Sequence, residues 1–402
     1  MALWEYGCSR QKGERMKTYE LMAPCHFGLE SVTKKEIYEL GYEISDVRDG
    51  RVSFIGDAEA IARANIFIRS AERILLKVGE FRAESYEELF QGTRALPLEE
   101  FIPEDGSFWV TKASSINSKL YSPRDIQSVM KKAMVDRLGR IYHRSWFEEH
   151  GAKYPFRVSL YKDQLTVALD TSGESLHKRG YRLKAGKAPI TETLAASLLL
   201  LSGWRAELPL IDPMCGSGTF LIEAAMLAAG ISPGADRAFT AEGWSNLVPR
   251  KHWNEAVTEA NEQIDRGILA GGAGRALDIQ GYDIDPAMLP VCRENAERAG
   301  VGKLIHFQLR ELAKLSHSGR GGYLITNPPY GERIEDRRNL PLLYTELREA
   351  WEGLDHWKLY LITAYEDAQR YLGRADKNRK IYNGMMKTYF YSYGIRPRQE
   401  KK

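Results

Sequence analysis

The sequence is short of cysteine and of long apolar runs, and both shortages narrow what the protein can be. Its four cysteines, at positions 8, 25, 215 and 292, lack the spacing of metal ligands or of a disulfide framework. We therefore expect reduced thiols in a cytosolic protein that holds no metal. No apolar run approaches the ~20 residues that cross a bilayer, and the first residues contain no apolar leader core. These features predict a cytoplasmic protein without a membrane partner.

The net charge is small as well. Lysine and arginine number 57 against 54 aspartates and glutamates, which gives a formal charge of +3. That value is too low to require a polyanionic partner, so local basic clusters matter more than the total. The length of 402 residues, with 43% hydrophobic and 28% charged residues, predicts two or three globular domains. Residues 1–15 precede the first alternating pattern, and we treat them as an appendage.

The first domain is expected to mix short strands and helices. Residues 18–22 and 51–55 alternate like strands, and a turn at Asp49-Gly50 precedes the second of them. Residues 28–40 and 58–68 carry apolar side chains at helical spacing. Alternation of such short elements predicts a ferredoxin-like α+β domain, which we assign to residues 16–70.

A new pattern begins at about residue 71 and runs to 172. Ser122 as an N-cap and Pro123 at the first helical position predict a helix that closes at Gly139. Residues 156–161 and 164–170 follow as two β-patterned runs. The outer face of the helix carries Arg124 and Lys131 among other basic residues. A solvated polar face and a face that contacts RNA explain this pattern equally well.

Residues 173–188 form a basic segment at a domain boundary. They have no apolar period and combine glycine with lysine and arginine. A solvated linker would have this composition. A strap that contacts phosphates, with Tyr181 inside it, would have the same composition, so both interpretations stay open.

The remainder, residues 189–402, alternates strands and helices, which predicts a doubly wound, Rossmann-like α/β domain with a parallel sheet. The expected strands are Leu208–Ile211, Ile279–Tyr282, Leu304–Phe307, Gly322–Thr326 and Lys358–Thr363. Residues 230–274 are too long for a plain strand-to-helix connection. The last segment predicts a hairpin that turns at Asn383-Gly384.

The first of three motifs runs from Asp212 through Pro-Met-Cys-Gly-Ser-Gly to Thr219. A buried strand leads into a Gly-x-Gly turn and then into a helix. Glycines let a ligand approach the backbone, and the helix N-terminus favours negative groups. No lysine follows Gly218, and only two glycines are present, so a phosphate-binding P-loop and a dinucleotide GxGxxG fingerprint both fit poorly.

The second motif, Gly281-Tyr-Asp-Ile-Asp-Pro286, places an acidic residue at the end of the next strand. A carboxylate there can accept both hydrogen bonds from ribose hydroxyls, and Asp283 is the better candidate. Asp285 is better explained as an N-cap before Pro286.

The third motif is Asn327-Pro-Pro-Tyr330, directly after a predicted strand. Two prolines fix the backbone, so the Asn327 side-chain oxygen and the Pro328 carbonyl can point the same way. Two convergent acceptors suit a substrate that presents an NH₂ group, and Tyr330 offers a face for a planar ring. After two other motifs in register, a plain turn becomes the weaker explanation.

Taken together, the three motifs resemble those of the amino-group methyltransferases that use S-adenosylmethionine. The segment Ser172-Gly-Glu-Ser-Leu-His-Lys-Arg-Gly-Tyr-Arg182 and the mixed N-terminal half make the resemblance more specific. The chain resembles the THUMP-domain guanine-N2 methyltransferases of bacterial large-subunit (23S) ribosomal RNA, from about Met16 to about Tyr393. The resemblance implies a ferredoxin-like domain, a THUMP RNA-binding domain and a Rossmann-like catalytic domain.

The resemblance also implies roles for individual residues. The catalytic group would be Asn327, Pro328 and Tyr330. S-adenosylmethionine would lie against Asp212, Cys215, Gly216, Gly218, Thr219, Asp283, Ile284, Glu311 and Asn327. Glu311 departs from the family, where aspartate is frequent near the adenine. Structured RNA, as 23S ribosomal RNA or a ribosome assembly intermediate, would contact Lys112, Lys119, Arg124, Lys131, Lys178, Arg179, Tyr181 and Arg182.

Other functions share parts of this pattern. The same corner serves adenine N6 and glutamine amide nitrogens, although a THUMP-like half argues against a DNA or protein substrate. Methylation of a transfer RNA guanine is the nearest alternative. A non-catalytic RNA-binding assembly factor would have no reason to keep the glycine turn and Asn327, and a nicotinamide oxidoreductase needs a fuller glycine fingerprint.

Overall fold

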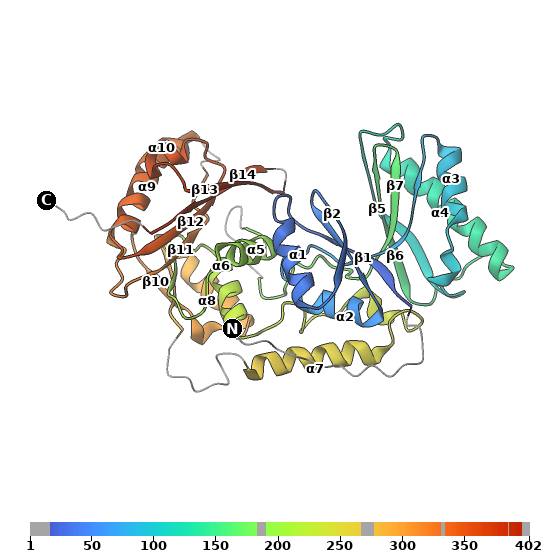
Figure 1. Cartoon of the computed structure of the whole chain (residues 1–402), viewed down its shortest axis with the longest axis horizontal. Helices are drawn as coiled ribbons and strands as arrows, with labels where there is room; N and C mark the ends of the chain where they lie inside the picture. The colour runs from blue at the N-terminus through green and yellow to red at the C-terminus, as the bar shows by residue number, and fades with distance from the viewer. Residues whose placement is uncertain (1–16, 183–189, 267–276, 331–333, 385, 396–402) are drawn as a thin grey trace.

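The computed structural model describes residues 17–182, 190–266, 277–330, 334–384 and 386–395. Two seven-stranded sheets lie at opposite ends of the molecule (Figure 1). The predicted appendage of residues 1–15 and most of the second half of the basic segment lie outside the described residues.

The N-terminal sheet has the strand order β2-β3-β1-β4-β7-β6-β5. Its first half confirms the ferredoxin-like expectation, because two βαβ-type crossovers interleave their strands. The elements are β1 (Tyr19–Pro24), α1 (Glu30–Glu39), β2 (Glu43–Arg48), β3 (Arg51–Gly56), α2 (Ala58–Phe67) and β4 (Leu75–Arg82).

The second half of this sheet is joined to the first through β4. This strand pairs with β1 at Leu21↔Leu76 and then with β7 over its whole length. The added elements are α3 (Tyr86–Ala95), β5 (Ser107–Ile116), α4 (Pro123–Tyr142), β6 (Lys153–Tyr161) and β7 (Gln164–Asp170). As the sequence predicts, Ser122 caps α4 and Pro123 opens it, but the helix ends at Tyr142 and not at Gly139. The two N-terminal domains therefore share one continuous sheet.

The C-terminal sheet has the order β10-β9-β8-β11-β12-β14-β13, parallel except for β14, which runs antiparallel to both of its neighbours. Its strands are β8 (Leu210–Asp212), β9 (Ile279–Asp283), β10 (His306–Leu309), β11 (Gly322–Thr326), β12 (Trp357–Thr363), β13 (Lys377–Asn383) and β14 (Met386–Tyr393). Its helices are α5 (Glu192–Ser202), α6 (Thr219–Ala228), α8 (Met288–Arg298), α9 (Ile334–Glu352) and α10 (Ala368–Leu372). The doubly wound expectation is confirmed.

Several local predictions in this domain were wrong by one or two residues; strand β8, for example, begins at Leu210 and not at Leu208. The β10 strand starts at His306, because residues 302–304 form a 3₁₀ turn. Helix α8 starts at Met288, after a turn in which Asp285 accepts from the Ala287 backbone N–H at 2.9 Å. In the hairpin, Asn383 is paired with Met386 inside the ladder. Gly384, with φ +61°, is therefore the first residue of the turn.

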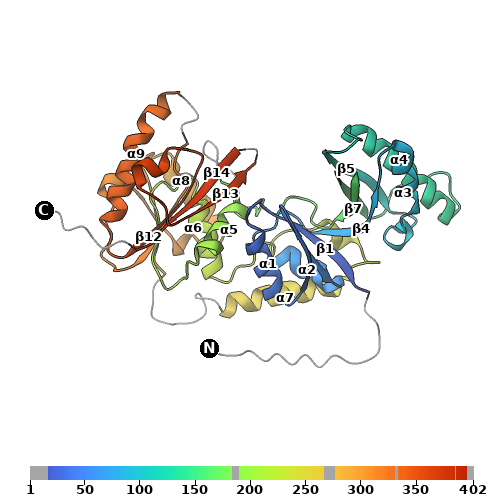
Figure 2. The same ribbon diagram turned by 45° about the horizontal axis from the view of Figure 1, so that its top comes forward.

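The long segment after α6 packs on the N-terminal half. Its helix α7 (Arg250–Arg266) runs along α2 (Figures 1 and 2). Arg63 of α2 donates two hydrogen bonds of 2.8 Å to Glu259. The indole of Trp244 stacks on Tyr154 with ring centroids 5.1 Å apart. This segment therefore attaches the C-terminal domain to the two N-terminal domains.

Candidate functional site

The three motifs meet at one edge of the C-terminal sheet. Strands β9, β8 and β11 are neighbours, and all three run in the same direction. The first motif follows β8, Asp283 ends β9, and Asn327 follows β11. Open α/β sheets bind ligands at the carboxyl ends of their parallel strands. The fold therefore brings the predicted cofactor residues and the predicted amine-binding residues to a common site.

The glycine turn after β8 has a left-handed backbone at Gly216 (φ +52°) and Gly218 (φ +81°). A Cβ on Gly216 would meet no atom within 4 Å, so this residue faces open space in which a ligand can approach the backbone. A Cβ on Gly218 would lie 3.1 Å from the Cβ of Cys292 and 3.3 Å from a ring atom of Phe307. Gly216 therefore borders the site, and Gly218 is required by packing.

Several hydrogen bonds hold this turn to the rest of the domain. The Cys215 N–H donates to the Tyr282 carbonyl at 2.9 Å, and the buried Asn295 side chain donates to the Ser217 carbonyl at 3.1 Å. Asn295 was missed from the sequence. Its position on the buried stripe of α8, beside Cys292, is the signal that could have found it, because a buried amide needs a partner.

Cys215 itself is buried beside the thiol of Cys292. A hydrogen bond with Cys292 and burial raise its pKa well above the usual value. Because the Cys215 backbone N–H already donates to Tyr282 of β9, Cys215 contributes to the shape of the turn.

The Asp283 carboxylate organises the base of the site. One oxygen accepts from the Gly216 N–H at 2.8 Å and the other from the Asp285 N–H at 2.9 Å. A carboxylate has about four lone-pair positions, so both oxygens can still accept hydroxyl groups. The next side chain, Ile284, is 73% exposed although it is large and apolar. An exposed apolar surface beside a carboxylate fits a ring attached to a ribose.

Two other predicted cofactor residues differ in accessibility. Asp212 is buried at the end of β8, and burial raises its pKa to about 7. It accepts from the Met214 N–H at 3.1 Å, which stabilises the start of the turn. Glu311 is exposed and forms an ion pair of 2.8 Å with Lys314.

The corner after β11 carries the candidate amine acceptors. Asn327 is half-buried, Pro328 is buried and Pro329 is exposed. The Tyr330 hydroxyl donates a hydrogen bond to Asn327 Oδ1, which fixes the orientation of the amide. An amide oxygen has two lone pairs, so it can accept a further N–H while Tyr330 holds it.

The described part of the basic segment, residues 173–182, differs from both sequence interpretations. The Arg179 side chain is 2% exposed and Tyr181 is buried, and both contact the buried carboxylate of Glu223 on α6, at 3.5 and 3.1 Å. Arg182 is 13% exposed and donates to Thr219 Oγ1 at 2.8 Å and to the Ile190 carbonyl. The prediction that these three side chains contact RNA is wrong for this structure, because their polar groups are already paired in the interior.

The other predicted RNA contacts lie on the surface. Lys178 is 59% exposed beside Glu174, and Lys112 and Arg124 are exposed as well. Lys119 pairs with Glu84, and Lys131 pairs with Glu149. An RNA phosphate would have to compete with these two carboxylates.

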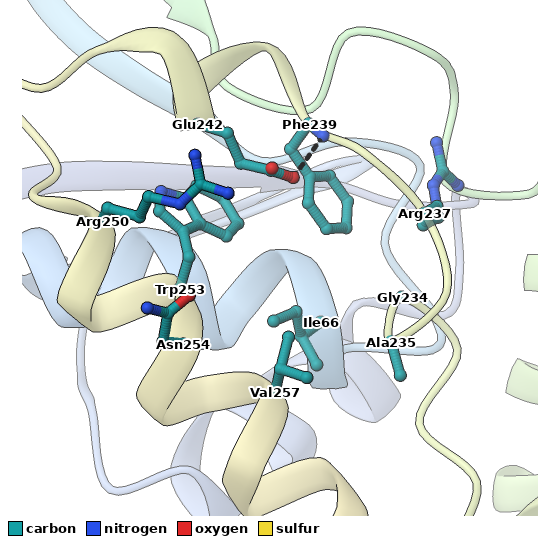
Figure 3. Close-up of a pocket in the computed structure, with 10 residues that line it drawn as sticks. All are labelled: Ile66, Gly234, Ala235, Arg237, Phe239, Glu242, Arg250, Trp253, Asn254 and Val257. Atoms are coloured by element: carbon teal, nitrogen blue, oxygen red, sulfur yellow. Dashed lines mark hydrogen bonds between the residues drawn. The ribbon is translucent and has the colours of Figure 1, made fainter.

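A separate pocket of about 130 Å³ lies where α2 meets the long segment after α6. Figure 3 shows Phe239 and Trp253 on one side of it and Ile66 and Val257 on the other. The two aromatic rings stack with centroids 5.3 Å apart. None of the residues lining the pocket belongs to the three motifs, so it takes no part in the candidate site. Among the described residues, no helix is long and apolar enough to cross a membrane, and no cluster of metal-ligating side chains is present.

Comparison with known domain families finds three matches in order along the chain. Residues 20–75 match the RlmL ferredoxin-like domain, residues 83–170 match the THUMP domain, and residues 179–391 match the RMKL-like methyltransferase domain. The last match covers more than half of the sequence.

Individual proteins are similar over nearly the whole chain. YpsC of Bacillus subtilis (strain 168) is 42% identical over 96% of this chain and 99% of its own length. The ribosomal RNA large subunit methyltransferase K/L of Psychromonas ingrahamii is 35% identical over 94% of this chain, which spans half of that protein.

Many solved structures share the fold, among them two that match nearly the whole chain. One is a possible methylase from Clostridium difficile 630, with a TM-score of 0.90 and 45% identity over 96% of this chain and all of that one. The other is SMU.472 in complex with SAH, with a TM-score of 0.87 and 40% identity over 96% of this chain and all of that one.

Proposed function

Because the chain belongs to the RlmKL-like family of RNA methyltransferases, we propose that it methylates the exocyclic N2 of a guanine in 23S ribosomal RNA. Its cofactor is S-adenosylmethionine, as in this family, of which one relative was crystallised with SAH. The observation that carries the proposal is the convergence of the glycine turn, Asp283 and Asn327 at the ends of three adjacent strands.

The residues at this edge suit the cofactor in both shape and chemistry. The open space at Gly216 admits a ligand to the backbone of the turn. The free lone pairs of Asp283 would accept the ribose hydroxyls, and Ile284 with Glu311 would lie beside the adenine. When bound, S-adenosylmethionine supplies an electrophilic methyl group on its sulfonium.

The remaining chemistry is the work of the corner after β11. The lone pair of a guanine N2 is delocalised into the ring, so this nitrogen is a poor nucleophile. Asn327 Oδ1 and the Pro328 carbonyl would accept its two N–H hydrogens and turn the lone pair out of the ring plane. Tyr330 would stack on the base. The catalytic effect then comes from positioning and preorganised acceptors, with the proton leaving afterwards and no strong base required.

The RNA must present the guanine outside its stack, at a cost of a few kcal/mol. Contacts from the THUMP domain and its exposed cations, including Lys112, Lys119, Arg124, Lys131 and Lys178, would offset that cost through phosphates and shape. These contacts carry little sequence information, so the choice of nucleotide rests on the RNA fold.

The test is methylation of 23S ribosomal RNA and transfer RNA transcripts in parallel with labelled S-adenosylmethionine, followed by nucleoside analysis. We expect N2-methylguanosine from the wild type. Asn327→Ala should lower the turnover rate by about 10²–10³-fold, by analogy with the loss of one preorganised donor, with the cofactor dissociation constant nearly unchanged. Asp283→Ala should mainly weaken cofactor binding.

Other outcomes are equally informative. Equal loss of turnover and cofactor affinity in Asn327→Ala would give Asn327 a structural role. Label found in N6-methyladenosine would show that adenine and not guanine is the substrate base. Label found only in transfer RNA would show that transfer RNA is the substrate.

A further inference from the structure

The C-terminal hairpin of β13 and β14 bears an unexplained pattern of lysine and tyrosine. In this ladder Lys380 is paired with Tyr389, and Tyr382 is paired with Lys387. Directly paired residues point to the same face of a sheet, so the four side chains lie on one face. On this face lysine and tyrosine alternate both along each strand and across the pair. We refer to Lys380, Tyr382, Lys387 and Tyr389 as the hairpin quartet.

The quartet lies next to the candidate site. The last residue of β11, Thr326, is paired with Leu361 of β12, and two residues further along Thr363 is paired with Tyr389. The hairpin tip therefore extends past the edge at which Asn327 lies. With strands about 4.8 Å apart, Tyr389 is about 10 Å from the line of β11, which is close enough for neighbours of a nucleotide bound at Asn327.

The chemistry of the quartet is that of a surface for unpaired nucleic acid. Both lysines are exposed and both tyrosines are half-buried. Each ammonium lies 5.1 Å from the ring centroid of the tyrosine on its own strand. In the part of the chain that the structure describes, neither ammonium has a carboxylate within 4.0 Å, unlike Lys119 and Lys131. The Tyr389 hydroxyl is the main cause that raises the pKa of Lys387 above its usual value, and Glu366 contributes less.

The opposite face of the hairpin is anchored, so the quartet is held rigidly. Ile381 belongs to the core that contains Leu29, the residue directly before α1. Arg379 donates to the Gly28 carbonyl at 2.8 Å, and a Cβ on Gly28 would lie 2.6 Å from the Lys380 carbonyl. Figures 1 and 2 both show the hairpin reaching from the C-terminal sheet to α1. A preorganised surface loses little entropy when it binds a flexible strand.

We infer that the hairpin quartet binds the single-stranded nucleotides adjacent to the target nucleotide. Lys380 and Lys387 contact their phosphates, and Tyr382 and Tyr389 stack on their bases, as in other proteins that bind unpaired strands. This inference rests on the proposed RNA substrate, and it identifies a contact surface outside the catalytic motifs.

The test compares two double variants with the same charge change. Lys380→Ala/Lys387→Ala should raise the KM for RNA about 10-fold and reduce the slope of log affinity against log salt by about 1.4, since each phosphate contact to a single strand contributes about 0.7. Lys251→Ala/Lys303→Ala, on exposed positions of α7 and the turn before β10, should change neither. Cofactor binding should be unaffected in both.

Single variants separate stacking from folding. Tyr382→Ala should weaken RNA binding by about 10-fold, and Tyr382→Phe should restore it, because stacking does not need the hydroxyl. Unfolding midpoints identify any variant that merely loses stability. If wild-type activity is present and the lysine double variant behaves like its control, the inference about the hairpin quartet is refuted and the proposed function is unaffected. If the wild type neither binds nor methylates RNA, the proposed function fails with it.

Discussion

Arg179 provides the sharpest test of what the basic segment does. Its side chain is only 2% exposed and lies 3.5 Å from the Glu223 carboxylate, which is fully buried. It also donates to the backbone carbonyls of Leu176 and Arg69 at 2.7 and 2.6 Å. Removing one member of a buried ion pair costs about 3–5 kcal/mol, because the other charge stays buried without compensation. Arg69 also lies near Glu223 and retains part of that compensation. We therefore expect Arg179→Ala to lose about 3 kcal/mol.

The measurement is the free energy of unfolding from urea titration, with RNA affinity measured in parallel. Lys178→Ala is the matched control, since the neighbouring lysine is 59% exposed and paired with Glu174 at the surface. It should change stability by less than about 0.5 kcal/mol. If Arg179→Ala kept the wild-type stability and lost RNA affinity instead, the buried network would be irrelevant and the segment would be an RNA strap.

Two further predictions concern the site itself. Gly216→Ala should abolish S-adenosylmethionine binding in calorimetry, and it should lower the free energy of unfolding only by the ~1–2 kcal/mol of a left-handed alanine. Gly218→Ala should lower the free energy of unfolding by a further ~1–3 kcal/mol, because its Cβ would overpack against Cys292 and Phe307. Equal stability of the two variants would contradict this distinction. Because burial raises the pKa of Asp212 from its usual 3.8 to about 7, the folded protein retains a proton that the unfolded chain has released. The contribution of this proton to the free energy of unfolding is therefore complete below about pH 4. It is lost as the pH rises to about 7, and the loss is on the order of 4 kcal/mol. Urea midpoints measured from pH 4 to pH 8 should fall less in Asp212→Asn than in the wild type, and parallel curves would show that Asp212 does not titrate in this range.

Much of the C-terminal domain could be predicted, because its strands and helices alternate and its motifs follow strands directly. The β8 turn, Asp283 and Asn327 each come at the end of an apolar run, and parallel strands bring such ends together. Boundaries such as the start of β10 were less predictable, since a 3₁₀ turn has no distinct apolar period.

The basic segment shows where local sequence is insufficient. Arginine and tyrosine in a glycine-rich stretch have the same appearance whether they meet RNA or a buried carboxylate. The deciding partner, Glu223, lies 44 residues after Arg179 on an apolar helix. A charged residue in the middle of that helix was the available signal. The contact between the C-terminal hairpin and α1 joins positions about 350 residues apart, and no local pattern could have predicted it.

We propose that this protein places one methyl group on N2 of a guanine in 23S ribosomal RNA. The most direct measurement is mass-spectrometric mapping of modified nucleosides in ribosomal and transfer RNA from a strain that lacks the gene. We expect loss of N2-methylguanosine at one position of 23S ribosomal RNA, restored by the wild-type protein and not by Asn327→Ala. An unchanged ribosomal map, or a loss confined to transfer RNA, would contradict it.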